Sequence, residues 1–373
     1  MRRETRPLRG DSPGAGRSLT AYHYEGRRGG PRVYLQAGLH ADEMPGVLIL
    51  QHLLDLLDRA EAAGQIAGDI CVVPMANPIG LAQWQNGRPQ GRFDADTAKN
   101  FNRFYPELDR LVGDDLEANL TPSADENRAI IRAAFRAALD RAEGKTDGED
   151  LRLQLLRWSC DADYVLDLHC DHHAVLHLYA STVRPDDTSR LCRSVGAKLA
   201  LVQAVSGGNA FDEAHTVPWL RLAERFAGRY PIPMACFSST LEYRGQFDVS
   251  DDLAAADARN LMTFLAAIGT LAADAAPRPA FADAPHLPLG GAAEVFAPLG
   301  GVLSWTRAPG DQVTVGEVIA HVTDPVTRDR VPVISPVGGM LFRQELWRAV
   351  LRGQGLGHVA GTEIVREGEL LSD

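Results

Sequence analysis

Apolar runs and amphipathic stretches alternate along the chain and predict a sheet covered by helices. The run RVYLQA (residues 32–37) is β-rich and ends at Gly38, and the segment that follows Pro45 has helical periodicity from Val47 onward. A second buried strand is expected over residues 69–76. Two buried strands around one helix are typical of a βαβ unit in a parallel sheet.

The same patterns continue towards residue 276. Residues 124–144 predict an amphipathic helix, residues 162–170 and 233–243 predict buried strands, and residues 252–276 predict a long closing helix. Between these elements, residues 77–106 are rich in Gly, Asn, Pro and Arg, and form a long irregular segment. Long segments of this kind inside a compact domain are usually functional or disordered, so we expect this one to line a site.

Changes of composition divide the chain into three parts. Residues 1–30 are Arg-, Gly- and Pro-rich and are expected to be disordered or loosely attached. Residues 31–277 form the main domain, which ends where four prolines interrupt the periodicity between residues 277 and 288. Residues 278–373 contain short alternating strands with Gly and Pro between them, and predict a small all-β module.

Charge and cysteine usage limit the partners and the compartment. The formal net charge is -11, which argues against nucleic acid and anionic membranes as partners because both would repel the chain. Five scattered cysteines suit neither a disulfide framework nor a thiolate zinc site. No signal peptide or membrane-spanning apolar run is expected, and the predicted location is cytoplasmic.

Three residues at the ends of predicted strands could share a metal ion. His40 and Glu43 lie in the turn after the first strand, since Pro45 disfavours helix at Met44, and His169 ends the strand YVLDLHC. Ligand sites in α/β sheets gather at this carboxyl edge. Each residue also has an interpretation without a metal. His40 could be a surface histidine beside Glu43, an acid at the start of a helix, and His169 could be a hydrogen-bonded histidine at a strand end. By strand alternation, Asp167 faces the same side as His169.

Two imidazoles and one carboxylate leave a fourth position for water, as in catalytic zinc sites, and we expect one Zn²⁺ per chain. Such a site needs a group that moves protons, and Glu242 ends another buried strand, where a carboxylate is otherwise costly. The alternative for Glu242 is an ion pair with Arg244 or Arg103. The histidines of the CDHH segment that follows His169 are not expected to form a second metal site, because consecutive side chains rarely converge on one ion.

Four motifs, GLHADEMPG, NFNRFYP, DLHC and TLEYRG, occur in the order seen in the succinylglutamate desuccinylase/aspartoacylase family, which this chain resembles over residues 33–276. The resemblance implies a zinc-carboxypeptidase-like mixed sheet flanked by helices. It also implies zinc on the three residues described above and a catalytic Glu242. Substrate polar groups would be met by Asn102 and Arg103, with Arg92 as an upstream anion-binding or oxyanion-polarising residue. We expect Arg244 to contact substrate as well.

The C-terminal module resembles the β-hammerhead of biotinyl and lipoyl carrier domains, which this hydrolase family also carries. The chain has only three lysines, Lys99, Lys145 and Lys198, so covalent attachment of biotin or lipoate to this module is excluded. We expect the module to restrict access to the site or to pack in a homo-oligomer.

The leading functional hypothesis is a zinc-dependent amidohydrolase that removes an acetyl, succinyl or similar acyl group from a small N-acyl amino acid, with water as nucleophile and Glu242 as general base and acid. A zinc carboxypeptidase that trims short peptides has the same ligands and is the first alternative. A non-catalytic binding protein with this fold is the second.

Overall fold

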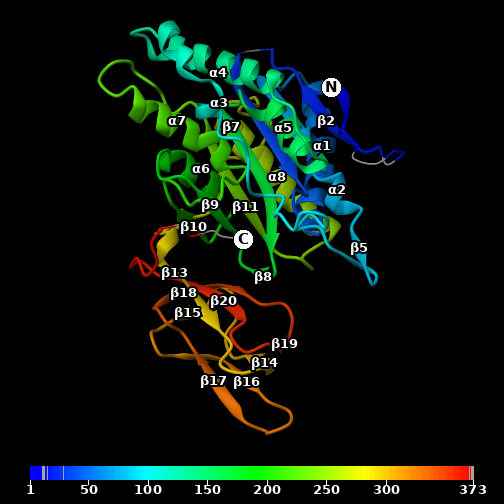
Figure 1. Cartoon of the computed structure of the whole chain (residues 1–373), viewed down its shortest axis with the longest axis vertical. Helices are drawn as coiled ribbons and strands as arrows, with labels where there is room; N and C mark the ends of the chain where they lie inside the picture. The colour runs from blue at the N-terminus through cyan, green and yellow to red at the C-terminus, as the bar shows by residue number, and fades with distance from the viewer. Residues whose placement is uncertain (11–12, 15, 28, 369, 371–373) are drawn as a thin grey trace.

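The large sheet has nine strands in the order β1-β2-β4-β3-β7-β11-β9-β10-β12. The computed structural model describes residues 1–10, 13–14, 16–27, 29–368 and 370 (Figure 1). Neighbours β4, β3, β7 and β11 are parallel, whereas β9 is antiparallel to β11. The predicted mixed α/β sheet is therefore confirmed. Its strands are β1 (Arg2–Pro7), β2 (Ser18–Tyr24), β3 (Gly30–Ala37), β4 (Gly68–Val73), β7 (Tyr164–Asp171), β9 (His177–Ala180), β10 (Leu199–Val202), β11 (Phe237–Gly245) and β12 (His286–Pro288).

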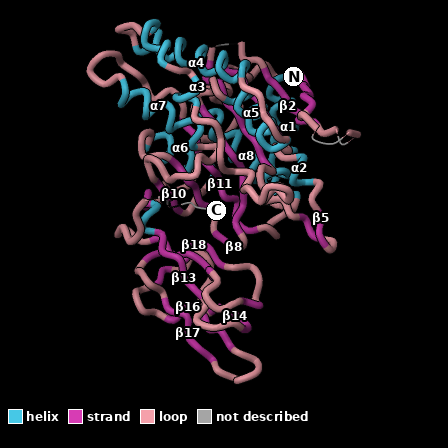
Figure 2. The backbone as a smooth tube through the Cα atoms, viewed as in Figure 1, coloured by secondary structure: helices cyan, strands magenta, loops and turns pink. Residues whose placement is uncertain are grey.

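Helices cover both faces of this sheet (Figure 2). Two separate apolar cores lie between the sheet and the helices, one on each face. Among the described residues, no helix is long and apolar enough to cross a membrane. One face carries α1 (Met44–Ala62), α6 (Pro185–Val195) and α8 (Asp251–Ala267), and the other carries α3 (Leu108–Leu111), α4 (Ala124–Arg141), α5 (Asp147–Ser159) and α7 (Glu213–Arg225).

Helix ends follow ordinary capping chemistry. The side chains of Ser123, Thr146 and Ser250 accept backbone N–H groups at the starts of α4, α5 and α8. The predicted closing helix is shorter than expected, because α8 ends at Ala267 and Gly269 then adopts a φ of 80°, which reverses the chain. The remaining short elements are α2 (Pro78–Leu81), the hairpin strands β5 (Trp84–Gln85) and β6 (Arg88–Pro89), and the 3₁₀ turn η1 (Asp114–Asn119).

The prediction that residues 1–30 are disordered or loosely attached is wrong where the structure describes them. Strands β1 and β2 form an antiparallel pair, and β2 joins the edge of the large sheet through β4. Alternation in SLTAYHY buries Leu19 and Ala21 completely, and both pack in the core beneath α4 and α5. The Arg- and Gly-rich composition around this short strand hid the period-two pattern from the sequence analysis.

The C-terminal residues form two small antiparallel sheets around an apolar core of their own. Strand β12 pairs in parallel with β10 of the large sheet, so the predicted division after residue 277 precedes a strand of the main domain. The two sheets follow from Ala292 onward. The first sheet contains β13 (Ala292–Phe296), β15 (Gln312–Val313), β18 (Gly339–Gln344) and β20 (Gly355–Ala360). The second contains β14 (Gly301–Trp305), β16 (Val318–Thr323), β17 (Arg330–Ile334) and β19 (Ala349–Val350). The 3₁₀ turn η2 (Leu289–Gly291) precedes both.

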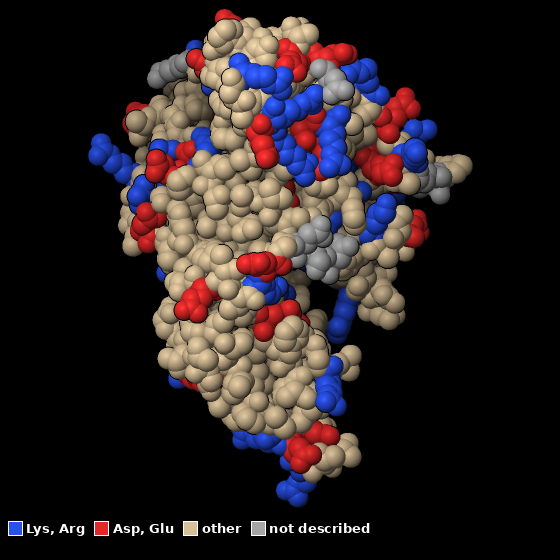
Figure 3. Space-filling view, turned by 60° about the vertical axis from the view of Figure 1, so that its left-hand side comes forward, with Lys and Arg blue, Asp and Glu red and all other residues tan. Residues whose placement is uncertain are grey.

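The module is tied to the main domain next to the end of β7. The chain leaves β7 and forms β8 (His173–Ala174), which pairs with β18 of the module. Beside this pairing, Arg343 Nε lies 2.5 Å from Asp171 Oδ1. On the face shown in Figure 3, acidic and basic side chains are interspersed over the upper part of the main domain.

Candidate metal centre and active site

Strand alternation places the polar side chains of the sheet on one face. Leu166, Leu168 and Leu241 pack in the core under α1, α6 and α8. The residues between them on β7 and β11 must therefore point to the opposite face. Asp167, His169 and Glu242 share this face, and His169 and Glu242 are direct neighbours in the parallel register of β7 and β11.

The structure brings the three predicted metal ligands together. His40 and Glu43 follow β3, and His169 lies near the carboxyl end of the adjacent β7. Their candidate donor atoms all lie within 4.8 Å of one another, and all three residues are buried. The two oxygens of Glu43 are 3.0 Å from His40 Nδ1 and 2.8 Å from His169 Nδ1.

Hydrogen bonds at the far side of each ring fix which nitrogen faces the centre. His40 Nε2 is 2.9 Å from Asn100 Oδ1, and that oxygen also accepts the backbone N–H of Asn102, so His40 Nε2 must donate. His169 Nε2 is 2.9 Å from Asp167 Oδ2 and donates to it. The Nδ1 atoms of both rings are then the electron-pair donors. Two oriented imidazoles and one carboxylate fit a zinc ion with an open fourth position.

Burial and mutual charge set the protonation of this group. Burial disfavours the charged Glu43, but His40 and His169 outweigh it and hold the pKa of Glu43 well below its usual range. Burial also favours neutral His169, but Asp167 and Glu43 raise the pKa of His169 well above its usual value. Burial and the nearby Arg92 lower the pKa of His40 to about 4. A metal cation between His40, Glu43 and His169 would likewise stabilise the ionised form of Glu43.

The start of α1 is pressed against the sheet beside the centre. Glu43 is the N-cap of α1, where the helix dipole favours a negative charge. Gly46 permits the close approach, because a Cβ there would lie 2.9 Å from both Leu168 Cβ and Leu168 O. The backbone geometry of the HADEMPG turn therefore depends on a glycine in the first turn of the helix.

Glu242 has the properties of a group that can exchange a proton. Burial, then the negative charges of Glu43 and Asp171, raise the pKa of Glu242 to about 8. Its Oε2 atom is buried and has no hydrogen-bond partner among the described residues. The alternative interpretation as an ion pair with Arg244 or Arg103 is not supported, because Arg244 has another partner and Arg103 bonds elsewhere.

Arg92 and Asn102, two of the predicted substrate-binding residues, lie close to the metal centre. Arg92 Nη1 is 3.2 Å from His40 Nδ1 and 3.5 Å from Glu43 Oε1, and the arginine side chain is half exposed. Asn102 Nδ2 is 3.5 Å from His169 Nε2. Arg103 is buried and its guanidinium donates to the carbonyl of Asn102 at 2.7 Å.

Arg244 does not fit the predicted role. Its guanidinium forms an ion pair with Asp257 of α8, on the face opposite the metal centre. The reason is a φ of 61° at Arg244, which breaks the strand alternation that would place it on the face of Glu242. The arginine therefore fastens the end of β11 to α8.

One residue of the site, Asn100, was not predicted from the sequence. Asn100, which orients His40, lies two residues before Asn102 in the NFNR segment, but a sequence alone does not show which asparagine is buried. In the CDHH segment, His172 Nδ1 lies 3.3 Å from Glu345 of the module, and His173 is exposed. No second metal-binding group of three or more ligands occurs in the part of the chain that the structure describes.

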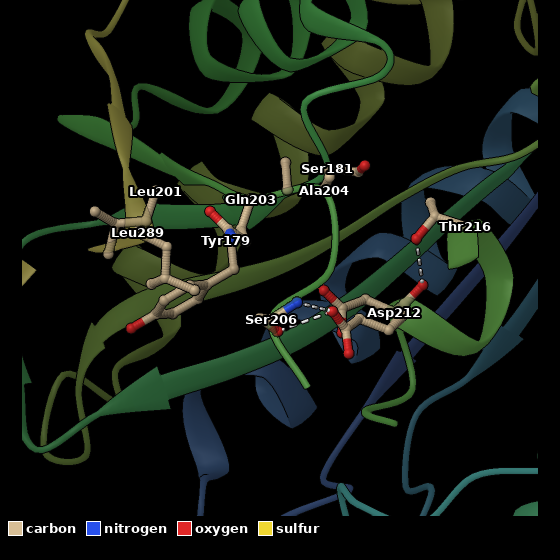
Figure 4. A pocket seen from close by; sticks show the side chains of 11 residues that line it. Tyr179, Ser181, Leu201, Gln203, Ala204, Ser206, Asp212, Thr216 and Leu289 are labelled. Atoms are coloured by element: carbon tan, nitrogen blue, oxygen red, sulfur yellow. Dashed lines mark hydrogen bonds between the residues drawn. The ribbon is translucent and has the colours of Figure 1, made fainter. Parts of the chain in front are cut away.

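A separate cavity is lined by residues that do not belong to the metal centre (Figure 4). It has a volume of only about 20 Å³ and is lined by Tyr179, Gln203 and the start of α7. Burial, then the charges of Glu213 and Asp167, raise the pKa of Asp212 to about 7. The backbone N–H of Phe211 donates to Asn102 Oδ1 at 2.9 Å, so the Asn102 segment contacts the loop that precedes α7.

This fold and donor set define a mixed α/β protein with a candidate mononuclear metal centre at the carboxyl edge of its sheet. The profile of the succinylglutamate desuccinylase/aspartoacylase catalytic domain matches residues 29–268. The chain belongs to this family of deacylases, and the predicted resemblance is confirmed.

Solved structures with the same fold extend over nearly the whole chain. A succinylglutamate desuccinylase/aspartoacylase family protein from Shewanella amazonensis is 24% identical with a TM-score of 0.83, and the match covers 96% of this chain and 98% of that one. One from Shewanella frigidimarina is 24% identical with a TM-score of 0.81, covering 96% of each chain. The product-bound ectoine utilization protein EutE (DoeB) from Ruegeria pomeroyi is 16% identical with a TM-score of 0.64, covering 96% and 95%. The comparison with curated proteins gives no match.

Proposed function

We propose that this protein is a zinc-dependent amidohydrolase that removes an acyl group from a small N-acyl amino acid. The observation that carries the proposal is the convergence of His40 Nδ1, Glu43 and His169 Nδ1 within 4.8 Å, with Glu242 next to His169 in the sheet. When bound, zinc would supply a Lewis acid that activates water and polarises an amide carbonyl.

The chain's own residues supply the remaining steps. Glu242 takes a proton from the attacking water and later donates it to the departing nitrogen, and its raised pKa makes the carboxylate a stronger proton acceptor for the first step. Arg92 lies at the half-exposed side of the centre, where its guanidinium can bind a carboxylate or stabilise the developing oxyanion. Asn102 lies on the other side, beside His169.

The C-terminal module favours small substrates over peptides. Its loop between β18 and β19 reaches the main domain at two points: Glu345 contacts His172, and the guanidinium of Arg88 lies 4.7 Å from the ring centre of Trp347. Arg88 belongs to the hairpin that precedes Arg92, so main domain and module meet close to the metal centre. A carboxypeptidase would need room for an extended chain there, and it remains the second candidate.

The first experiment measures the metal and the substrate range of the full-length protein. Purified wild type should contain about one zinc per chain, the stoichiometry of a mononuclear catalytic site. His169→Ala should lose the metal, whereas His173→Ala, an exposed histidine four residues later, should keep it.

Activity is then measured as release of primary amine from N-acetyl and N-succinyl amino acids and from tri- and tetrapeptides. Turnover of the N-acyl amino acids alone supports the proposal, and preferential turnover of peptides identifies a carboxypeptidase. Metal-free protein that stays inactive on all of these substrates after zinc addition would overturn both.

A further inference from the structure

A buried histidine lies beside the catalytic carboxylate on the neighbouring strand. Strands β9 and β11 are antiparallel, and His177 is the direct cross-strand partner of Glu242. Their neighbours Leu178 and Leu241 pack in the core under α1 and α8, so His177 and Glu242 both face the side that carries the metal centre. Side chains that are opposite each other in an antiparallel pair have Cβ atoms about 4.5–5.5 Å apart.

Each of these two residues has one buried polar atom that no described residue bonds. His177 is fully buried, and its Nδ1 lies 2.9 Å from the carbonyl oxygen of Val175. A carbonyl only accepts, so Nδ1 carries the hydrogen and Nε2 of the neutral ring is an acceptor. Neither His177 Nε2 nor Glu242 Oε2 has a hydrogen-bond partner among the described residues. Buried polar atoms of native proteins are nearly always paired, so both atoms need a donor.

The other neighbours of His177 do not account for its imidazole. The rings of Tyr179 and Phe342 pack against it with centroids 5.4 and 5.0 Å away and hold its plane. The nearby Asp171 is already bound by Arg343 at 2.5 Å and by the backbone N–H of His172 at 2.8 Å. An apolar side chain would fill this position without an unsatisfied nitrogen, so a purely structural role explains the histidine poorly.

We propose that His177 is the positioning residue of the catalytic carboxylate, with its Nε2 linked to Glu242 Oε2 through one water that donates to both acceptors. A single water is the link that satisfies two acceptors lying beyond direct hydrogen-bond distance. Fixing Oε2 leaves Oε1 of Glu242 to take the proton from the attacking water and to pass it to the departing amine. The imidazole stays neutral throughout, and Glu242 returns to a carboxylate. The inference rests on the proposed hydrolysis and adds a residue that the motifs do not contain.

Kinetics of zinc-loaded, full-length variants test this role. His177→Leu removes the acceptor at similar volume, and His177→Gln offers a side-chain oxygen near the position of Nε2. We expect kcat to fall about tenfold in His177→Leu, the factor that corresponds to one hydrogen bond, with KM within about twofold of wild type. His177→Gln should recover most of the loss. Zinc content and melting temperature report any general damage.

Nitrogen-15 spectra of the histidine rings give a readout that does not depend on turnover. In Glu242→Ala, the Nε2 resonance of His177 should move towards that of an imidazole without a hydrogen bond. His215 is the internal reference and should not move, because its Nε2 is bonded to Ser159 Oγ at 2.8 Å.

The possible results separate the two proposals. An unchanged kcat in folded His177→Leu, or an unmoved Nε2 resonance in Glu242→Ala, would overturn the role of His177. If His177→Leu does not fold, the spectra alone decide. A wild type that hydrolyses none of the N-acyl substrates would instead refute the proposed function, and the spectra would still test the link.

Discussion

Asp167→Asn should weaken zinc binding without unfolding the protein. Asp167 is completely buried, and its Oδ2 accepts from His169 Nε2 at 2.9 Å. Its other oxygen accepts from Gln36 Nε2 at 3.0 Å, and Gln36 Oε1 accepts from the Tyr34 hydroxyl at 2.9 Å. An asparagine keeps one acceptor for His169, and Gln36 can rotate its amide to accept from the new NH₂ group while the Tyr34 oxygen accepts from Gln36.

The expected magnitude follows from the loss of charge alone. Hydrogen bonds to a charged group contribute about 1.5–3 kcal/mol, against about 0.5–1.5 kcal/mol for neutral pairs. The difference of about 1–1.5 kcal/mol corresponds to about a tenfold weaker zinc Kd. This lies within the range of about 10–100-fold found when partners of metal-bound histidines are changed.

Competition with a fluorescent zinc chelator at pH 8 measures the Kd. Asp163→Asn is the matched control, because Asp163 forms an ion pair with Arg132 and accepts the backbone N–H of Arg32, outside the donor set. Its zinc Kd should equal that of wild type even where its stability falls. A zinc Kd of Asp167→Asn within twofold of wild type, in protein of unchanged melting temperature, would refute the view that Asp167 orients His169 for the metal.

Two further predictions concern stability. Gly46→Ala should lower the free energy of unfolding by about 1–3 kcal/mol in urea denaturation, because the added Cβ overpacks the contact with Leu168. The control Gly148→Ala should lower it by nothing, because the atom nearest to its added Cβ lies at 3.4 Å. Equal losses in the two variants would contradict this reasoning. Burial opposes ionisation of Glu345, but hydrogen bonds from His172 and a backbone N–H lower its pKa from 4.5 to about 2. Ionised Glu345 therefore stabilises the folded protein above pH 4.5, and this stabilisation is lost as the pH falls towards 2. The stability difference between wild type and Glu345→Gln, followed by thermal denaturation, should therefore shrink over that range, and a constant difference would refute it.

Strong local patterns made much of the main domain predictable. The strand YVLDLHC is apolar on the side that faces α1 and α8, and its alternation already places Asp167 and His169 on the other side. The carboxyl ends of parallel strands meet at one edge, so the candidate ligands His40, Glu43 and His169 could be proposed together from their positions. The short strand β2 was missed because seven residues inside a Gly- and Arg-rich stretch carry little signal of alternation.

The sequence by itself determined strands β3, β4, β7 and β11, the order of the motifs and the residues able to bind a metal, because these depend on local periodicity and side-chain chemistry. Only the tertiary structure decided how each polar group is paired. Asn100 meets His40 across 60 positions of the chain, and Arg343 of the module meets Asp171 of β7. A positive φ turns Arg244 away from the centre to Asp257. Hydrogen bonds and ion pairs between distant segments depend on the packing of the whole chain, and no local pattern encodes them.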